Sequence, residues 1–153
     1  MAVRLHDERR YAVTPARLAA MWRDPAFQEA RSAHLGTLAA RCAVEGDTVV
    51  LEETRDTGWP PHLYVTRMTT RWEGLRARWT IERLAGPGDA RATGSLEIRP
   101  APAGASLTLE GTLEVRVPIL GGLIERLARR ALVGERDREA AFVAVWIARL
   151  PAA

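Results

Sequence analysis

The sequence predicts an α+β fold, in which one strand and two short helices precede six further strands and a long C-terminal helix. Two observations predict it. Between residues 37 and 117 apolar residues recur with the period of two that half-buried strands show, and beyond residue 118 they recur with the period of a helix. The chain has 153 residues, 47% of them hydrophobic, so we expect a single domain, 1–153, with its own core.

Residues 2–11 are expected to form the first strand. Val3, Leu5 and Tyr11 share one face of such a strand, and the even-numbered positions from 4 to 10 are polar. Two short helices are expected next, each behind a capping residue and a proline that suits the first helical turn. The two ranges and their caps are 16–22 after Thr14-Pro15 and 26–33 after Asp24-Pro25.

Six strands are expected between residues 37 and 117, because Gly, Pro and Asp separate the alternating stretches. The Gly46-Asp47 pair is a tight hairpin signal, and the other connections are also short. Short connections join antiparallel neighbours, so these strands are predicted to form a meander. The expected ranges are 37–45, 48–55, 63–73, 76–84, 91–99 and 105–117.

A long helix is expected from about Ile119 to Leu150, because Pro118 has no amide hydrogen and ends the preceding strand. Gly134 interrupts its pattern, and the part from Ala140 to Ala148 is apolar on most sides, so this part must pack against a large surface. Five arginines of the helix alternate with acids and are expected to form a solvated face rather than a membrane-binding one. They are Arg126, Arg129, Arg130, Arg136 and Arg138.

The composition argues against several classes of function. The net charge is only +3 and every basic residue is arginine, interspersed with acids, so no nucleic-acid partner is expected. No segment approaches the ~20 apolar residues that span a bilayer, and the N-terminal residues lack an apolar core, so we expect a cytoplasmic protein without stable membrane insertion. Cys42 has no second cysteine as a partner. His6, His34 and His62 are scattered, so no metal and no cofactor are expected.

The order of the elements resembles that of the START-like (SRPBCC) superfamily. The residues that carry the resemblance are the segment from Thr14-Pro15 to Asp24-Pro25-Ala26-Phe27, and VPILGGLIE before a helix that ends in Phe142 and Trp146. The chain is most similar to a bacterial branch of unassigned function with a VP-x-x-GG-x-x-E signature, here Val117-Pro118, Gly121-Gly122 and Glu125. The resemblance implies a helix-grip fold: a curved seven-stranded antiparallel sheet around the C-terminal helix, often with a cavity for an apolar ligand.

Strand parity and helix spacing indicate which side chains would line such a cavity. They combine aromatic rings, a thioether and a hydroxyl with aliphatic groups, which suits an amphipathic small molecule. The predicted ligand-binding residues are Tyr64, Met68, Thr70, Trp72, Trp79, Ile81, Leu96, Leu109, Leu123, Leu127, Phe142 and Trp146. A filled core needs the same apolar residues, so the sequence leaves the choice between cavity and core open.

Three charged residues are candidates for contacts with the polar end of a ligand. Glu53 and Arg55 share strand parity with apolar residues that point inward, and Arg138 lies on the apolar line of the helix. A charge removed from water needs a partner. The group therefore either orients a ligand or forms an ion pair or a charged rim.

The leading hypothesis is a non-catalytic domain that binds or transports a lipid-like or aromatic small molecule, with no catalytic residue assigned. A second hypothesis is an enzyme of the cyclase or dehydratase type that uses the same cavity, with Tyr64, His62 and Glu53 for acid–base chemistry. A third is a protein-interaction module that works through its surface without a ligand. Oligomeric state and ligand identity stay open.

Overall fold

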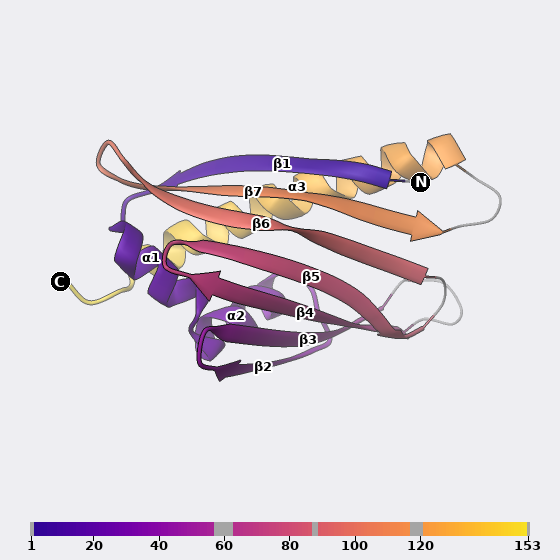
Figure 1. The fold of residues 1–153 in the computed structure, drawn as a ribbon, viewed down its shortest axis with the longest axis horizontal. Helices are drawn as coiled ribbons and strands as arrows, with labels where there is room; N and C mark the ends of the chain where they lie inside the picture. Colours follow the sequence, from indigo (N-terminus) through magenta and orange to yellow (C-terminus); the bar gives the residue numbers. More distant parts are fainter. Residues whose placement is uncertain (1, 57–62, 87–88, 117–120, 153) are drawn as a thin grey trace.

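The computed structural model of the protein describes residues 2–56, 63–86, 89–116 and 121–152, and their side chains except those of 115–116 and 121–129. Figure 1 shows the arrangement of the elements. In chain order they are β1 (Ala2–Tyr11), α1 (Pro15–Trp22), α2 (Pro25–His34), β2 (Ala39–Glu45), β3 (Thr48–Asp56), β4 (Leu63–Glu73), β5 (Arg76–Ala85), β6 (Asp89–Ala101), β7 (Gly104–Arg116) and α3 (Gly121–Ala148).

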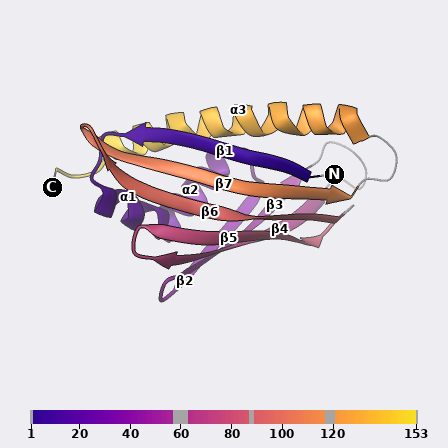
Figure 2. The ribbon, with the colours of Figure 1, turned by 45° about the horizontal axis from the view of Figure 1, so that its top comes forward.

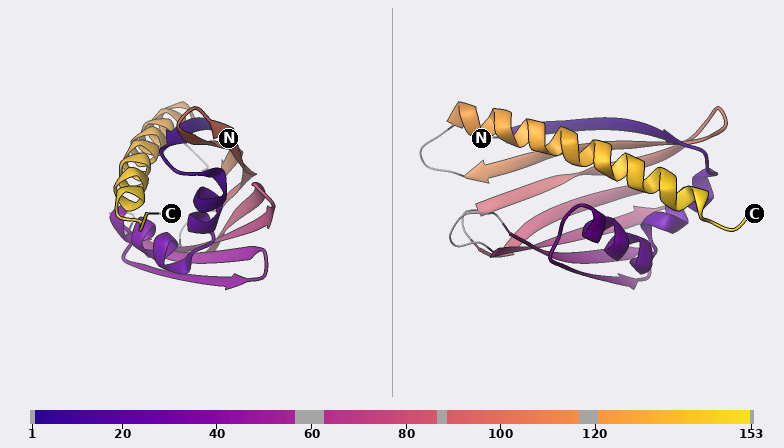
Figure 3. Two further views of the ribbon diagram at one scale, coloured as in Figure 1. Left: turned by 90° about the vertical axis from the view of Figure 1, so that its left-hand side faces the viewer. Right: turned by 180° about the vertical axis from the view of Figure 1, so that it is seen from behind.

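The predicted fold class is confirmed. The seven strands form one antiparallel sheet in the order β1-β7-β6-β5-β4-β3-β2, so β1 closes the meander by pairing with β7. The end-on view shows the sheet curving, with α3 on its open side and the two short helices closing one end (Figure 3). This is the helix-grip architecture. Boundaries differ from the expected ones by at most two residues, as at Ala39, where residue 37 was expected.

The two short helices begin where their caps predict. The hydroxyl of Thr14 accepts a hydrogen bond from the amide of Arg17, and a carboxylate oxygen of Asp24 accepts one from the amide of Ala26. A proline stands at the start of each helix, where its missing amide hydrogen costs nothing. These caps turn the chain sharply after β1 and bring α1 and α2 against the end of the sheet.

The long helix runs without a break through Gly134, as expected for a single helix, although this glycine interrupts the apolar pattern of the sequence. A helix tolerates an isolated glycine at a cost of about 1 kcal/mol relative to alanine. In Figure 2, α3 runs beside β1 along one side of the sheet, and its backbone lies near those of β1 and α2. The side chain of Val143 in its second half is fully buried.

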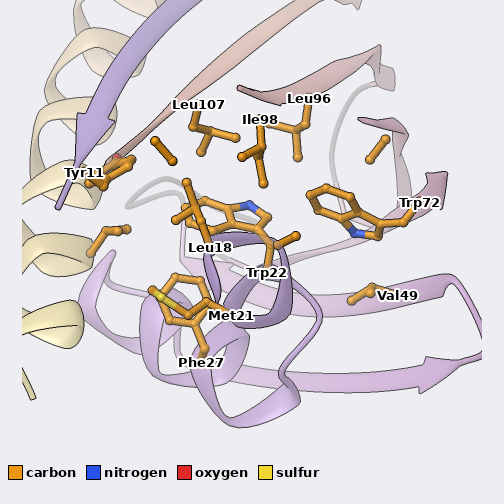
Figure 4. Close-up of a cluster of buried hydrophobic side chains, with 14 of the residues drawn as sticks. Tyr11, Leu18, Met21, Trp22, Phe27, Val49, Trp72, Leu96, Ile98 and Leu107 are labelled. Atoms are coloured by element: carbon orange, nitrogen blue, oxygen red, sulfur yellow. The ribbon is translucent and has the colours of Figure 1, made fainter. Parts of the chain in front are cut away.

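The filled part of the interior lies at the end of the sheet nearest α1 (Figure 4). Leu18, Trp22 and Phe27 from the short helices pack there against strand residues such as Ile98 and Leu107. Fully burying a large apolar side chain contributes roughly 1.5–3 kcal/mol, so this end anchors the fold.

Candidate ligand cavity

A cavity of about 370 Å³ lies between the sheet and the helices α2 and α3. It occupies the part of the interior that the filled core leaves open, and its volume is within the range of small-molecule sites. Of the two possibilities that the sequence left open, the structure therefore contains both: a filled core at one end and a cavity beside it. The apolar residues that line the cavity are Val3, Leu5, Trp22, Leu35, Met68, Trp79, Ile81, Leu96, Leu109, Leu132 and Val133.

The indole of Trp79 covers two glycines on the neighbouring strands. Trp79 of β5 pairs with Gly94 of β6, which pairs with Gly111 of β7. A Cβ atom added at Gly94 would overlap the indole Cζ2, and one added at Gly111 would lie 2.5 Å from the same atom, closer than packed atoms approach. The ring can lie close to the sheet only because both positions lack a side chain. The two glycines thus set the position of the cavity wall at Trp79.

Opposite charges line the cavity beside the apolar residues. We call the following eight side chains the charged wall: Asp7, Arg9, Arg31, Glu53, Arg55, Glu135, Arg136 and Glu139. Their exposed fractions lie between 4% and 31%, so all of them are largely withdrawn from water. Arg4 and His6 also line the cavity, but both are exposed.

Five members of the charged wall form a chain of ion pairs from β1 through α3 to α2. Asp7 lies 3.0 Å from Arg9 and 3.2 Å from Arg136. Arg136 lies 2.5 Å from Glu139, which lies 2.8 Å from Arg31. Each buried charge therefore has an opposite partner, as a site of low polarity requires. The chain ties α3 to the edge strand and to the short helix.

The other three members meet at the far side of the cavity. Nη2 of Arg55 lies 3.4 Å from a carboxylate oxygen of Glu53 and 3.2 Å from one of Glu135. Glu53 also accepts a short hydrogen bond from the hydroxyl of Ser32, which is fully buried. Of the alternatives for Glu53 and Arg55, the ion pair is present in the structure.

The electrostatics of the two arginines follow from this pairing. Burial alone would lower the pKa of Arg136, but the carboxylates of Glu139 and Asp7 outweigh it, and the pKa is raised. The same balance holds for Arg55, where burial is opposed by Glu135 and Glu53 and the pKa is again raised. Both guanidinium groups stay charged at every physiological pH.

The structure brings together seven of the residues that the sequence predicts for the site. They line the cavity from five strands: Glu53 and Arg55 of β3, Met68 of β4, Trp79 and Ile81 of β5, Leu96 of β6, and Leu109 of β7. Their common origin is strand parity, because each lies on the inward face of the curved sheet. Whether they contact a ligand stays a prediction.

Three predicted strand residues do not line the cavity. Thr70 and Trp72 are buried in β4, and Trp72 packs in the filled core with the guanidinium of Arg23 5.3 Å from its ring centroid. Tyr64 lies toward the other end of the same strand, with the guanidinium of Arg83 4.7 Å from its ring centroid. Strand parity predicts which face of a strand points inward but not where the cavity lies along the strand. This explains why the three residues share the inward parity and yet do not line the cavity.

Phe142 and Trp146 of α3 are also placed outside the cavity lining. Their rings pack on Phe27 of α2, with centroid distances of 6.0 and 5.5 Å, and Phe142 stacks on His34. These side chains join the two helices. Val117-Pro118 of the signature and His62 lie outside the described residues, whereas Gly121-Gly122 begin α3. The side chains of Leu123, Glu125 and Leu127 are not described.

Arg138 requires a further correction, because it is exposed and does not line the cavity. The inward stripe of the helix is Leu132, Arg136, Glu139 and Val143, at the spacing of one helical face. Arg138 is two residues from Arg136, which is about 200° around the helix. Arg136, expected on a solvated face, is instead part of the charged wall.

Six of the eight residues of the charged wall are not among those predicted from the sequence: Asp7, Arg9, Arg31, Glu135, Arg136 and Glu139. A signal for two of them was present, because Asp7 and Arg9 share the parity of Val3, Leu5 and Tyr11 in β1. Glu139 is only 3% exposed, which helical spacing from Val143 would indicate but residue type does not. A charged side chain on an inward face can be predicted to be buried only when its ion-pair partner on another element is known.

Neither a membrane-spanning helix nor a metal site is present among the described residues. Within that part of the chain no helix has the length and apolar character needed to cross a membrane. The same residues contain no group of three or more His, Cys, Asp or Glu side chains arranged to hold a metal ion.

The fold and the site together define a helix-grip protein with a cavity that is apolar on the sheet side and ion-paired beside the helices. Residues 7–147 match the family model described as a protein of unknown function, DUF2505. The chain therefore belongs to the DUF2505 family. No sequence among the curated proteins is similar enough to count as a relative.

Solved structures share the fold at low sequence identity. The protein TTHA0849 from Thermus thermophilus has a TM-score of 0.74 at 21% identity, over 97% of this chain and 100% of that one. The di-domain ARO/CYC BexL from the BE-7585A biosynthetic pathway has a TM-score of 0.71 at 15% identity, over 98% of this chain and 51% of that one. Ara h 8.0201 has a TM-score of 0.61 at 11% identity, over 94% and 98%. At these identities the likeness shows the fold.

Proposed function

We propose that the protein binds a hydrophobic or amphipathic small molecule in the cavity between the sheet and α3, and acts as a binding or transport domain rather than an enzyme. The observation that carries this proposal is the cavity of about 370 Å³ with an apolar wall of strand residues. A protein interior normally fills such a space with side chains. Here the inward side chains of the strands line the space and leave it open.

The first test is native mass spectrometry of the purified protein, followed by extraction under denaturing conditions. We expect a copurifying lipid-like or aromatic molecule that is released when the protein unfolds. A protein that carries no such molecule and binds none from a panel of apolar probes would contradict the proposal.

A matched pair of variants locates the binding. Ile81→Trp places a large ring in the cavity, whereas Thr80→Trp places the same ring on the exposed face of the same strand. We expect Ile81→Trp to lose ligand and Thr80→Trp to retain it. Both variants should fold, because the cavity offers space for the added ring and the outer face is open to solvent. Equal retention by both would move the site elsewhere.

A second candidate function, a cyclase or dehydratase-type enzyme, rests on two observations. Glu53 lines the cavity, and the fold is shared with BexL, a protein of a biosynthetic pathway. Tyr64, proposed with it for acid–base chemistry, does not line the cavity. If Glu53 acts on the copurifying molecule, then Glu53→Gln should change the molecule that is recovered, in mass where the reaction removes water and in chromatographic retention where it only closes a ring. Under the binding proposal the recovered molecule is the same for both proteins.

The single-domain organisation and the cytoplasmic location stay predictions. A single cooperative unfolding transition, seen alike by circular dichroism and by tryptophan fluorescence, would support the first. Fractionation of cells that produce the tagged protein tests the second.

A further inference from the structure

The eight side chains of the charged wall sum to no net charge, and each of them is paired with another member of the wall. It holds four arginines and four carboxylates, and every one of the eight has an ion-pair partner of opposite sign within the wall. Arg9 has an additional partner, Asp137, at 2.7 Å on the exposed side. Among the described side chains, the eight members of the wall therefore sum to no net charge. The chain through Asp7 and Glu139 has one arginine in excess, which Asp137 offsets, and the group around Arg55 has one carboxylate in excess.

An ionised ligand meets a penalty at such a wall. A ligand carboxylate could bind an arginine only by displacing one of the wall's carboxylates or by sharing its arginine. Either result places an extra negative charge among side chains that are largely withdrawn from water, where unbalanced charge is costly.

An uncharged polar group meets no such penalty. A hydroxyl can donate to a carboxylate oxygen, and a carbonyl or ester oxygen can accept from a guanidinium, because these groups have more hydrogen-bonding positions than one ion pair uses. The contacts of Arg55 with Glu53 and Glu135, between 3.2 and 3.5 Å, are longer than close charge-assisted bonds. A ligand oxygen can therefore bind beside Arg55 without removing a partner.

We propose that the charged wall makes this cavity selective for uncharged amphipathic molecules, with a hydroxyl, carbonyl or ester oxygen as their polar group, over carboxylates of the same shape. This selectivity rests on the proposed binding function. It adds the chemical class of the ligand, which the apolar wall alone does not determine.

Two matched pairs of probes test the selectivity: methyl 1-naphthoate against 1-naphthoate, and dodecanol against dodecanoate. Their binding is measured by isothermal titration calorimetry at neutral pH. We expect the uncharged member of at least one pair to bind at least about tenfold more tightly, a difference of ~1.4 kcal/mol. Equal or tighter binding of the ionised members overturns the selectivity and leaves the proposed function standing. Binding of no probe counts against both.

Variants connect the selectivity to the wall. Glu135→Gln removes one carboxylate partner of Arg55, whereas Glu110→Gln removes the same charge from the outer face of β7, where Glu110 pairs with His6. We expect Glu135→Gln to strengthen the binding of 1-naphthoate by about tenfold and Glu110→Gln to leave it unchanged. An equal effect of both variants would show that net charge, and not the wall, sets the preference.

A third variant tests the mouth of the cavity, where the exposed Arg4 could attract an anion. Arg4→Gln is expected to leave the ratio of affinities for methyl 1-naphthoate and 1-naphthoate unchanged. If the variant changes that ratio by about tenfold or more, the charge of Arg4, rather than the charged wall, determines the preference for the uncharged probe, and the proposal fails.

Discussion

The guanidinium of Arg31 on α2 and the carboxylate of Glu139 on α3 lie 2.8 Å apart, with side-chain exposed fractions of 11% and 4%. Arg136 reaches the same carboxylate from within α3, so one acid serves two arginines. Glu139 thereby connects the long helix to the short helix beside the cavity. Its removal should affect the fold more than the removal of any surface charge.

We expect Glu139→Gln to lower the free energy of unfolding by about 3 kcal/mol, because it leaves two largely buried guanidinium groups short of a negative partner. Urea denaturation measures this loss. Glu110→Gln, at an acid that is 62% exposed, serves as the control and should change stability by less than about 0.5 kcal/mol. Similar losses for both variants would show that the connection between the helices does not depend on this pair.

The packing of Trp79 on glycine gives a second prediction. We expect Gly111→Ala to lower the free energy of unfolding by about 1–3 kcal/mol, because the new Cβ would lie 2.5 Å from the indole and 2.7 Å from the carbonyl oxygen of Thr93. In a Trp79→Leu background this loss should shrink, since part of the clash is removed with the ring. A cost that is the same in both backgrounds would assign the effect to the backbone alone.

Gly134 is the matched control for that substitution. It lies in α3, and a Cβ added there meets no atom within 4 Å. Gly134→Ala should therefore raise the free energy of unfolding by up to about 1 kcal/mol, the difference in helix propensity. A loss of stability at this position would contradict the description of α3 as an unbroken helix with an open surface at Gly134.

These residues also show how much the sequence could predict. Every element was predicted, because capping residues, turn residues and hydrophobic period are local signals that lie beside one another in the chain. The inward face of each strand was predicted for the same reason, and it gave residues such as Met68, Ile81 and Leu109. What failed was the position of the cavity along the sheet, which depends on where α1 and α2 end the filled core.

The charged wall could not be predicted for a different physical reason. Arg31 and Glu139 are separated by most of the chain, and the local sequence around each residue does not indicate that its side chain is buried. Burial of a charge depends on a partner, and a partner on another element leaves no mark in the local pattern. Arg136 and Arg138 illustrate the limit, since both are arginines on one helix and only their angular position distinguishes an inward side chain from an exposed one.

The hydroxyl of Tyr11 provides a prediction for alkaline pH. It is buried, with no hydrogen-bond partner in the described part of the chain, and burial raises its pKa from 10.0 to about 12, with Glu139 adding to the effect. Below pH 10 the folded and unfolded states both hold the proton, so the contribution to stability is complete. Above pH 10 the unfolded chain releases the proton first, and stability falls until the pH reaches about 12.

We expect the wild-type protein to lose up to about 1.4 kcal/mol per pH unit through Tyr11 in that window, and Tyr11→Phe to lack this contribution. The measurement is urea denaturation of both proteins between pH 9 and pH 12. Because Tyr64 is present in both, the difference between the two curves reports Tyr11. Parallel curves would show that the hydroxyl has a partner or is hydrated.

Cys42 should react slowly in the folded protein. Partial burial raises the pKa of its thiol from 9.0 to about 11, and the nearby Glu29 adds to the effect. Since the thiolate is the reactive form, alkylation at pH 8 should be about 100-fold slower in the folded protein than in urea. Equal rates in the folded and unfolded states would show that the thiol is neither buried nor perturbed.

The division of the interior into a filled end and a hollow end has a consequence for motion. Backbone amides of the strands around Tyr11, Ile98 and Leu107 should exchange with solvent deuterium only when the whole molecule unfolds. Amides of β1 near Val3 and Leu5, beside the cavity, should exchange through smaller and more frequent openings. The protein could then admit a molecule at one end while the other end stays folded. Hydrogen exchange resolved along β1 would show where exchange by local opening gives way to exchange by global unfolding.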